Sequence, residues 1–275
     1  MPTNTPTNTP PATATSTPVP VGYSEDFEAY SAGQDPTGWT DTAANNSMAA
    51  DDALFKTGSV GGTMAFGTTS TATNIHTHYT GSDAAGSDYR YTGRMYITNS
   101  SGGVGVTFYS DYPNSDTYYR LRRHGTEGDA AFHLSSHGAT VEGTHDTGVV
   151  PNINTWYRFV VEVEDVGGNT AIRAKVWEDG TTEPAAWQID ATDSSSPLTS
   201  GTFGLWAYNN GSKYWDDLAV TSLNADPTAS PTPANTPAAS ATATPTNTPQ
   251  ATATSTATPT SGSSGRVTDG LQVLY

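Results

Sequence analysis

The sequence contains no cysteine. This excludes disulfide bonds and cysteine-ligated metal sites. It also means that cysteine usage gives no information on the cellular compartment. There is also no run of about 18 apolar residues, so no membrane-spanning helix is expected. Met1 leads directly into Pro-Thr repeats, without a charged and then an apolar region, so no signal peptide is expected at this end.

Positive charge is scarce. The chain has 11 Lys and Arg against 27 Asp and Glu, for a net charge of −16. Nearly all of it lies within residues 21–223, because only Asp226, Arg266 and Asp269 are charged outside them. Such a field repels phosphate groups, so we expect neither nucleic acid as a partner nor membrane insertion. Neutral polymers and cations remain compatible with it.

Charge is missing altogether from two tracts, one before Glu25 and one from Pro227 to Gly265. Both consist mainly of Thr, Pro, Ala, Ser and Asn, and they share a repeat: PTNTPPATATST at 6–17 and PTNTPQATATST at 245–256. Such segments bury too little to fold and favour extended polyproline II. The prediction is a linker at 1–20, a single module at 21–223 and a second linker at 224–264. Dense Ser, Thr and Pro also suggest O-glycosylation of the linkers. Residues 265–275 resemble a strand that begins another module or completes a sheet in another copy.

The module has the pattern of an all-β domain. Short alternating runs separated by Gly, Asn and Asp turns occur throughout, and no long segment has a 3.6-residue apolar period. The expected strands include 91–98, 104–109, 118–123, 156–164, 171–177, 203–208 and 214–223. About a dozen strands in some 200 residues predict two stacked sheets, in a jelly-roll sandwich.

Alternation also assigns faces to the strands. Apolar residues such as Val106, Leu121 and Leu205 point inward, and Tyr, Trp and Arg side chains take the outer face of four strands. This predicts one outer patch that binds carbohydrate by aromatic stacking and polar contacts, made of Arg94, Tyr96, Tyr109, Tyr118, Arg120, Arg122, Trp206 and Tyr208. The arginines suggest an acidic sugar. Cross-strand aromatic pairing explains the same residues without a ligand. A second candidate site is the loop edge with Trp39, Tyr112, Asn114 and Asn209.

The order of these motifs resembles the concanavalin A-like lectin/glucanase superfamily, in particular its laminin-G-like and carbohydrate-binding members. The resemblance covers 23–223 and rests on Glu25-Asp26-Phe27-Glu28, Pro36-Thr37-Gly38-Trp39, Gly105-Val-Thr-Phe108 with Tyr118-Tyr-Arg-Leu121, Trp156-Tyr-Arg-Phe159, Gly204-Leu-Trp-Ala-Tyr208 and Tyr214-Trp-Asp-Asp-Leu218. It implies a structural Ca²⁺ where the first and last strands meet. Glu25 and Asp216, on inward faces by parity, are the expected ligands, with Asp26, Glu28 and Asp217 as further candidates. Alternatively, these acids lie in water at strand ends.

Catalysis has weaker support. Glycoside hydrolysis usually needs two facing carboxylates, and the nearest approach to such a motif is Glu162-Val-Glu164-Asp165, which lacks a third acid. His76 and His78 share a strand face without a carboxylate at metal-ligand spacing. These two and His124, His133, His137 and His145 are interpreted as surface histidines.

The leading hypothesis is therefore a non-catalytic carbohydrate-binding module of a larger extracellular or cell-surface protein, with a polysaccharide or a glycoprotein glycan as partner. The alternative is a structural or adhesive subunit of a surface layer or filament, assembled with copies of itself through the C-terminal strand. A polysaccharide hydrolase or lyase comes third.

Overall fold

The computed structural model describes residues 22–45, 47–81, 86–125 and 129–224. The expected linkers lie outside these residues, apart from Asn224, and so does the strand-like segment 265–275. The domain boundaries, the linkers and the donor-strand hypothesis therefore stay predictions.

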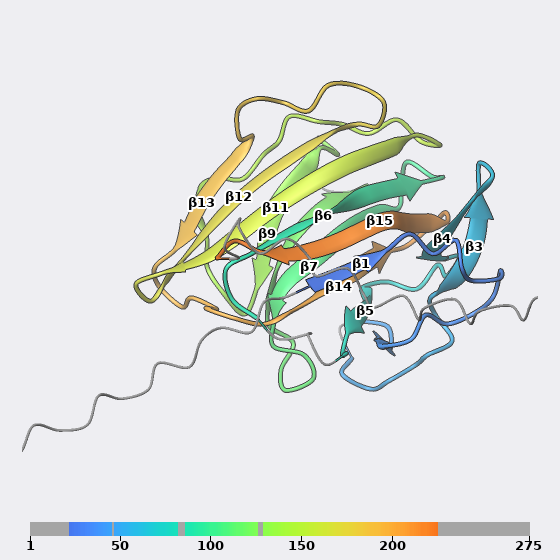
Figure 1. The fold of residues 1–275 in the computed structure, drawn as a ribbon, viewed down its shortest axis with the longest axis horizontal. Helices are drawn as coiled ribbons and strands as arrows, with labels where there is room; N and C mark the ends of the chain where they lie inside the picture. Colours follow the sequence, from blue (N-terminus) through green and yellow to red (C-terminus); the bar gives the residue numbers. More distant parts are fainter. Residues whose placement is uncertain (1–21, 46, 82–85, 126–128, 225–275) are drawn as a thin grey trace, which may run out of the picture. The chain divides into compact units, whose positions relative to one another are not determined.

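The described residues form fifteen strands (Figure 1). They are β1 (Gly22–Glu25), β2 (Trp39–Thr42), β3 (Lys56–Val60), β4 (Thr63–Thr68), β5 (Ile75–Tyr79), β6 (Tyr89–Ile97), β7 (Gly103–Ser110), β8 (Tyr118–His124), β9 (Phe132–His137), β10 (Glu142–Thr144), β11 (Trp156–Val166), β12 (Asn169–Glu178), β13 (Ile189–Asp193), β14 (Thr202–Tyr208) and β15 (Lys213–Ser222). Each strand named from the alternation pattern is present, with its ends shifted by a few residues at most. No helix occurs among the described residues, so none of them forms an apolar helix long enough to cross a membrane.

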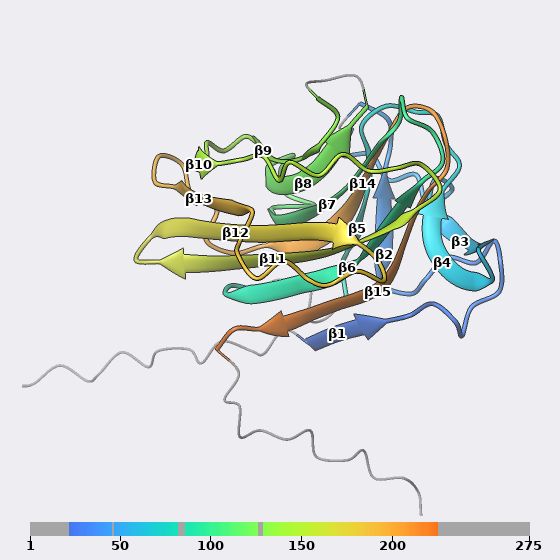
Figure 2. The ribbon, with the colours of Figure 1, turned by 90° about the horizontal axis from the view of Figure 1, so that it is seen from above.

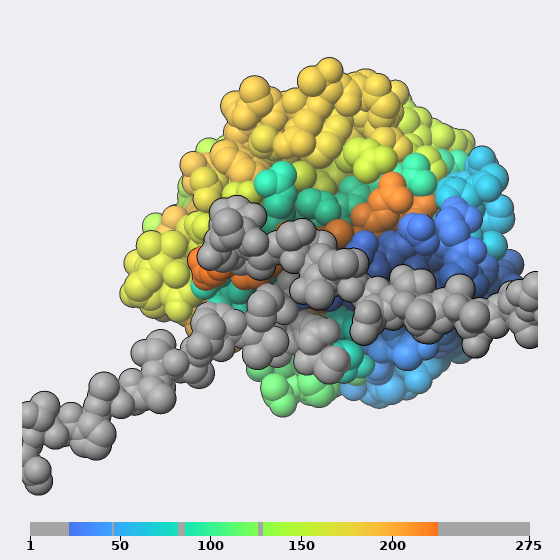
Figure 3. Space-filling view, in the orientation of Figure 1, coloured from blue at the N-terminus to red at the C-terminus, as the bar shows by residue number. Residues whose placement is uncertain are grey.

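The strands form two antiparallel sheets, which confirms the all-β sandwich (Figure 2). The nine-stranded sheet has the order β10-β13-β12-β11-β6-β15-β4-β3, with β1 paired to β15. The six-stranded sheet has the order β2-β5-β14-β7-β8-β9. Figure 3 shows the molecule from the side of the nine-stranded sheet, with the orange last strand next to the blue N-terminal segment.

The core lies between the sheets and holds the inward side chains that alternation predicts, among them Val106, Leu121 and Leu205. Aromatic residues link the two layers by hydrogen bonds as well as by packing. The indole N–H of Trp215 donates to the carbonyl of Gly105 at 3.1 Å, and the hydroxyl of Tyr89 accepts the N–H of Tyr109 at 2.8 Å. Because these polar groups are paired, the aromatic core carries little desolvation cost.

Turn chemistry is partly as expected. Gly167 and Gly168 join β11 to β12 in a two-residue hairpin, and both have positive φ, as this tight turn requires. The composition of Asn209-Asn210-Gly211 is also that of a hairpin turn. Instead this turn carries the chain from β14 in one sheet to β15 in the other.

Candidate functional site

The predicted patch does not lie on one surface. Arg94 and Tyr96 are on β6 of the nine-stranded sheet, whereas Tyr118, Arg120 and Arg122 on β8 and Trp206 and Tyr208 on β14 belong to the six-stranded sheet. The two groups therefore face opposite sides of the sandwich. The expectation of a single patch was wrong, because alternation tells which residues point outward but not which sheet a strand joins.

Tyr109 was also assigned to the wrong face. Its backbone is left-handed, with a φ of 44°, and its side chain is 0 % exposed. The pairing of β7 with β14 shifts its register at this end of the strand, and such a bulge turns the next side chain to the other face. The Tyr109 hydroxyl accordingly crosses the core, where it accepts the N–H of Asp88 at 2.8 Å.

The remaining five residues come together on the outer face of the six-stranded sheet, and their centre is Trp206. The guanidinium carbon of Arg120 lies 4.7 Å from the Trp206 ring centroid, and that of Arg122 lies 5.4 Å away. The Tyr208 ring is stacked beside the indole at 6.0 Å and 15°. We call Tyr118, Arg120, Arg122, Trp206 and Tyr208 the arginine-aromatic patch.

Hydrogen bonds fix the orientation of this patch. The Trp206 indole N–H donates to Asn74 Oδ1 at 2.7 Å. The Nε–H groups of Arg120 and Arg122 both donate to the hydroxyl of Ser135 on β9, at 3.0 and 3.1 Å. The two guanidinium groups are thus held by one hydroxyl and one ring.

Glycine makes room for this stack. A Cβ at Gly103 would lie 2.7 Å from the Trp206 ring, and a Cβ at Gly105 would lie 2.7 Å from the Cβ of Arg122. The run Gly103-Val104-Gly105 therefore has its valine in the core and its glycines under the outer rings. The sequence carried this signal, since glycines alternating with inward valines indicate a close approach on the outer face.

Trp206 itself is only 1 % exposed, whereas Arg122, Tyr208 and His124 are half-buried. The His124 ring lies 4.3 Å from that of Tyr208. A ligand would therefore meet arginine, tyrosine and histidine edges, with the indole as their support rather than as the stacking surface.

The same face continues into a histidine cluster. His76 and His78 on β5 are 1 % and 3 % exposed, so their interpretation as surface histidines was wrong. They point outward, but Ser47, Met48 and Tyr112 enclose them, and the Tyr112 ring stacks on His78 at 4.4 Å. Burial lowers the pKa of His76 well below its usual value and that of His78 to about 3. Both rings are therefore neutral at physiological pH.

Outward arginines on the nine-stranded sheet have carboxylate partners. Arg94 binds Asp216 at 2.7 Å and Asp179 at 3.2 Å, and Arg158 binds Asp179 at 2.5 Å and Asp217 at 3.2 Å. Opposing charge lowers the pKa of Asp179 against the effect of its partial burial. Tyr96 lies beside this network, with its ring 5.1 Å from that of Trp156.

The expected calcium ligands are already engaged. Asp216 is 1 % exposed, and its two oxygens accept the Arg94 guanidinium and the N–H of Asp217 at 2.7 Å each. Glu25 accepts the N–H of Phe27 at 2.9 Å. A hollow of about 300 Å³ is lined by Ser24, Glu25, Asp26 and Asp217, without Asp216. Arg94 therefore neutralises Asp216 in this structure, and calcium at the Glu25–Asp216 pair stays a prediction.

The candidate catalytic residues and the loop-edge residues do not form a common site either. Glu162 lies 3.1 Å from Arg90 and 3.6 Å from Arg173, and Glu164 lies 3.3 Å from Arg173, so both carboxylates belong to ion pairs on the nine-stranded sheet. At the loop edge, Trp39 packs into the core. Tyr112 and Asn114 line a hollow of about 360 Å³ that does not include Asn209.

No protein-family model matches the chain, and no curated protein matches it. Several solved structures have a similar fold. The carbohydrate-binding module CBM66 from Bacillus subtilis is 16% identical, with 68% of this chain and 96% of that chain covered and a TM-score of 0.43. A protein of unknown function with a galectin-like fold, also from B. subtilis, is 12% identical over 72% and 94% of the two chains, with a TM-score of 0.48. The Bacillus licheniformis beta-glucanase is 11% identical over 73% and 97%, with a TM-score of 0.41. At such identities and TM-scores these structures say nothing about function, which has to come from the side chains of this chain.

Proposed function

We propose that the chain binds a glycan on the outer face of the six-stranded sheet, through the arginine-aromatic patch and the neighbouring His124. The observation that carries the proposal is the fixed pair of arginines. Arg120 and Arg122 stack on one indole and donate to one Ser135 hydroxyl. Their planar groups are therefore oriented before any ligand arrives.

Preorganised arginines suit sugars for two reasons. A planar guanidinium can donate two parallel N–H bonds to neighbouring hydroxyl oxygens or to the carboxylate of a uronic acid. Groups that are already fixed also lose little conformational entropy on binding. The half-buried Tyr208 and His124 rings add apolar edges next to these donors. Together they favour a shallow site for a sugar, with preference for an acidic one.

The proposed role is non-catalytic and extracellular. The Glu162 and Glu164 carboxylates, which come nearest to a hydrolase motif, are paired with arginines on the opposite sheet. A shallow site binds each glycan weakly, and several modules on one chain would raise the avidity through effective concentration.

A glycan array of neutral and uronate-containing glycans tests the proposal, with the same protein in wild-type form and as Arg122→Ala and Tyr208→Ala. Both side chains are half-buried, so the fold should survive their removal. Loss of one charged hydrogen-bonding group should weaken binding about tenfold. Tyr96→Ala is the matched control, because it removes a tyrosine from the opposite face.

The site is supported if the wild type binds a glycan, Tyr96→Ala binds it equally well, and Arg122→Ala and Tyr208→Ala bind it more weakly. Absence of binding to every glycan would overturn the function. An equal loss in Tyr96→Ala would overturn the location.

A further inference from the structure

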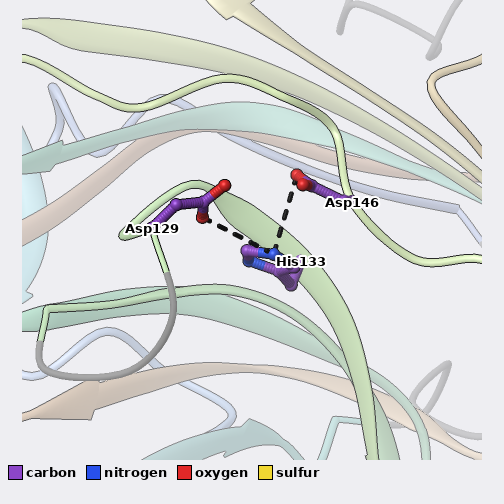
Figure 4. Close-up of side chains that lie close together, drawn as sticks. All are labelled: Asp129, His133 and Asp146. Atoms are coloured by element: carbon purple, nitrogen blue, oxygen red, sulfur yellow. Dashed lines mark ion pairs between the residues drawn. The ribbon is translucent and has the colours of Figure 1, made fainter.

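Two aspartates and a histidine meet at the start of β9, outside the arginine-aromatic patch (Figure 4). His133 Nε2 lies 3.7 Å from an oxygen of Asp129 and 3.6 Å from an oxygen of Asp146. The ligand atoms of the three residues all lie within 4.8 Å of one another. Asp129 comes from the turn before β9, and Asp146 pairs with His133 in an isolated bridge after β10.

A hydrogen bond at Nδ1, the other ring nitrogen of His133, fixes the orientation of the imidazole. Nδ1 lies 2.9 Å from the carbonyl oxygen of Ala131, and this oxygen can only accept a hydrogen bond. Nδ1 therefore carries a proton, which in the neutral ring leaves the lone pair on Nε2. That lone pair faces two carboxylates. A histidine held by a backbone carbonyl in this way is the usual arrangement of a metal-ligating imidazole.

The spacing fits a small divalent ion. A tetrahedral Zn²⁺ with bonds of about 2.0–2.2 Å to nitrogen and oxygen separates its ligand atoms by about 3.3–3.6 Å. The two nitrogen-to-oxygen distances of 3.7 and 3.6 Å are close to this range and too long for hydrogen bonds. One imidazole with carboxylates suits zinc better than calcium, which takes six to eight oxygen ligands.

We propose that Asp129, His133 and Asp146 bind a divalent transition-metal ion of the Zn²⁺ class, with a coordination position left for a ligand from outside. Two carboxylates and one neutral imidazole offset the charge of the ion, and the acidic chain attracts cations to it. The site is accessible, since both aspartates are exposed and His133 is half-buried.

The location gives this site a role next to the proposed glycan surface. His133 pairs with Arg122 in the register of β9 and β8, and Ser135, two residues further on, accepts from both patch arginines. An ion at the cluster therefore lies at the border of the arginine-aromatic patch. A sugar hydroxyl or carboxylate can fill its open position.

Isothermal titration of the metal-free protein with Zn²⁺, without glycan, tests the site. We expect saturable one-to-one binding and a higher midpoint of thermal unfolding with Zn²⁺. His133→Ala and the milder Asp146→Asn should each weaken binding about tenfold or more. His137→Ala is the matched control, because His137 lies on the same strand as His133 and is not part of the cluster of Asp129, His133 and Asp146.

Absence of Zn²⁺ binding would overturn the proposal, and so would binding that neither cluster variant weakens. Tighter binding of Ca²⁺ than of Zn²⁺ would overturn the class of metal. The titration contains no glycan, so its failure would not bear on the proposed glycan binding. In the same way, a glycan array without binding would not bear on the metal site.

Discussion

The outer faces of the two sheets use arginine differently. On the nine-stranded sheet Arg94 and Arg158 bind the carboxylates of Asp179, Asp216 and Asp217. On the six-stranded sheet Arg120 and Arg122 lie on the Trp206 ring and donate to Ser135. The first arrangement neutralises charge within the protein, whereas the second holds cationic groups in place on an aromatic support. An outward arginine therefore indicates a ligand site only once its neighbours are known.

Buried carboxylates show the same contrast. Asp216, on the nine-stranded sheet, is bound by the Arg94 guanidinium. Asp41, on β2 of the six-stranded sheet, is equally buried but accepts the N–H of Phe55 at 2.8 Å, and its charged neighbours Asp35 and Asp52 repel it. Burial raises the pKa of both carboxyl groups. The Arg94 guanidinium opposes this rise at Asp216, whereas the pKa of Asp41 reaches about 7.

The largest expected effect is on the pH dependence of stability, through Asp41. The unfolded chain releases this proton near pH 3.9, whereas the folded protein keeps it until about pH 7. The folded state thus binds more protons between these values, so its stability is highest in acid and falls as pH rises. The contribution amounts to about 4 kcal/mol at most. Asp41→Asn should remove it, which urea unfolding between pH 4.5 and 7.5 would detect against the wild type. Parallel pH profiles of the two proteins would contradict the raised pKa.

The next effect concerns the pair that neutralises Asp216. Arg94→Ala leaves this buried carboxylate without its cation and should lower the free energy of unfolding by about 3 kcal/mol. Adding Asp216→Asn to Arg94→Ala should recover part of the loss, because the uncompensated charge is then gone. Urea unfolding of the three proteins measures both changes.

Thermal melts of the wild type with EDTA and with added Ca²⁺ test the predicted calcium site. A wild-type midpoint that EDTA lowers, and that Ca²⁺ but not Zn²⁺ restores, would show that a cation, and not Arg94 alone, supports this region.

A smaller effect is expected from the support of the arginine-aromatic patch. Trp206→Phe removes the hydrogen bond to Asn74 and part of the ring under both guanidinium groups. We expect a loss of about 1 kcal/mol in stability and about tenfold in glycan affinity. Trp156→Phe, on the opposite face beside Arg94, is the control and should leave glycan binding unchanged. Weaker binding in both variants would mean that the two faces do not differ in function.

The smallest effect is expected from an ion pair that is more open to solvent than Arg94–Asp216. Arg90 lies 3.1 Å from Glu162, and these side chains are 38 % and 12 % exposed, against 18 % and 1 % for Arg94 and Asp216. Arg90→Ala should change stability by less than about 0.5 kcal/mol in thermal or urea melts, because water screens such pairs. A loss as large as that from Arg94→Ala would show that burial of the carboxylate is not what separates the two pairs.

The sequence predicted the strands and most of their inner faces because alternation depends only on local geometry. Val106, Leu121 and Leu205 are in the core as expected. Tyr109 was missed because a bulge, which no local pattern announced, reverses the parity at the end of β7. Arg94 and Tyr96 were grouped with Trp206 because pairing between distant strands decides which sheet contains a residue.

The histidines were missed for a related reason. His76 and His78 point outward, as their parity predicts, but residues from other parts of the chain cover them. His133 gains its two aspartates from the preceding turn and from a segment thirteen positions later, once the strand bridge has formed. Sites that depend on tertiary contacts of this kind cannot be read from spacing alone.

The pairing of the first and last strands has a mechanical consequence. Gly22 lies opposite Thr221, so the described part of the chain enters and leaves the sandwich at the same end of a strand pair. Force applied to these two ends would load the hydrogen bonds between β1 and β15 one after another, starting at the Gly22–Thr221 end. It would not load all of them at once in shear. The adjacent ends also allow the whole sandwich to be inserted into a surface loop of another protein without separating the flanks of that loop.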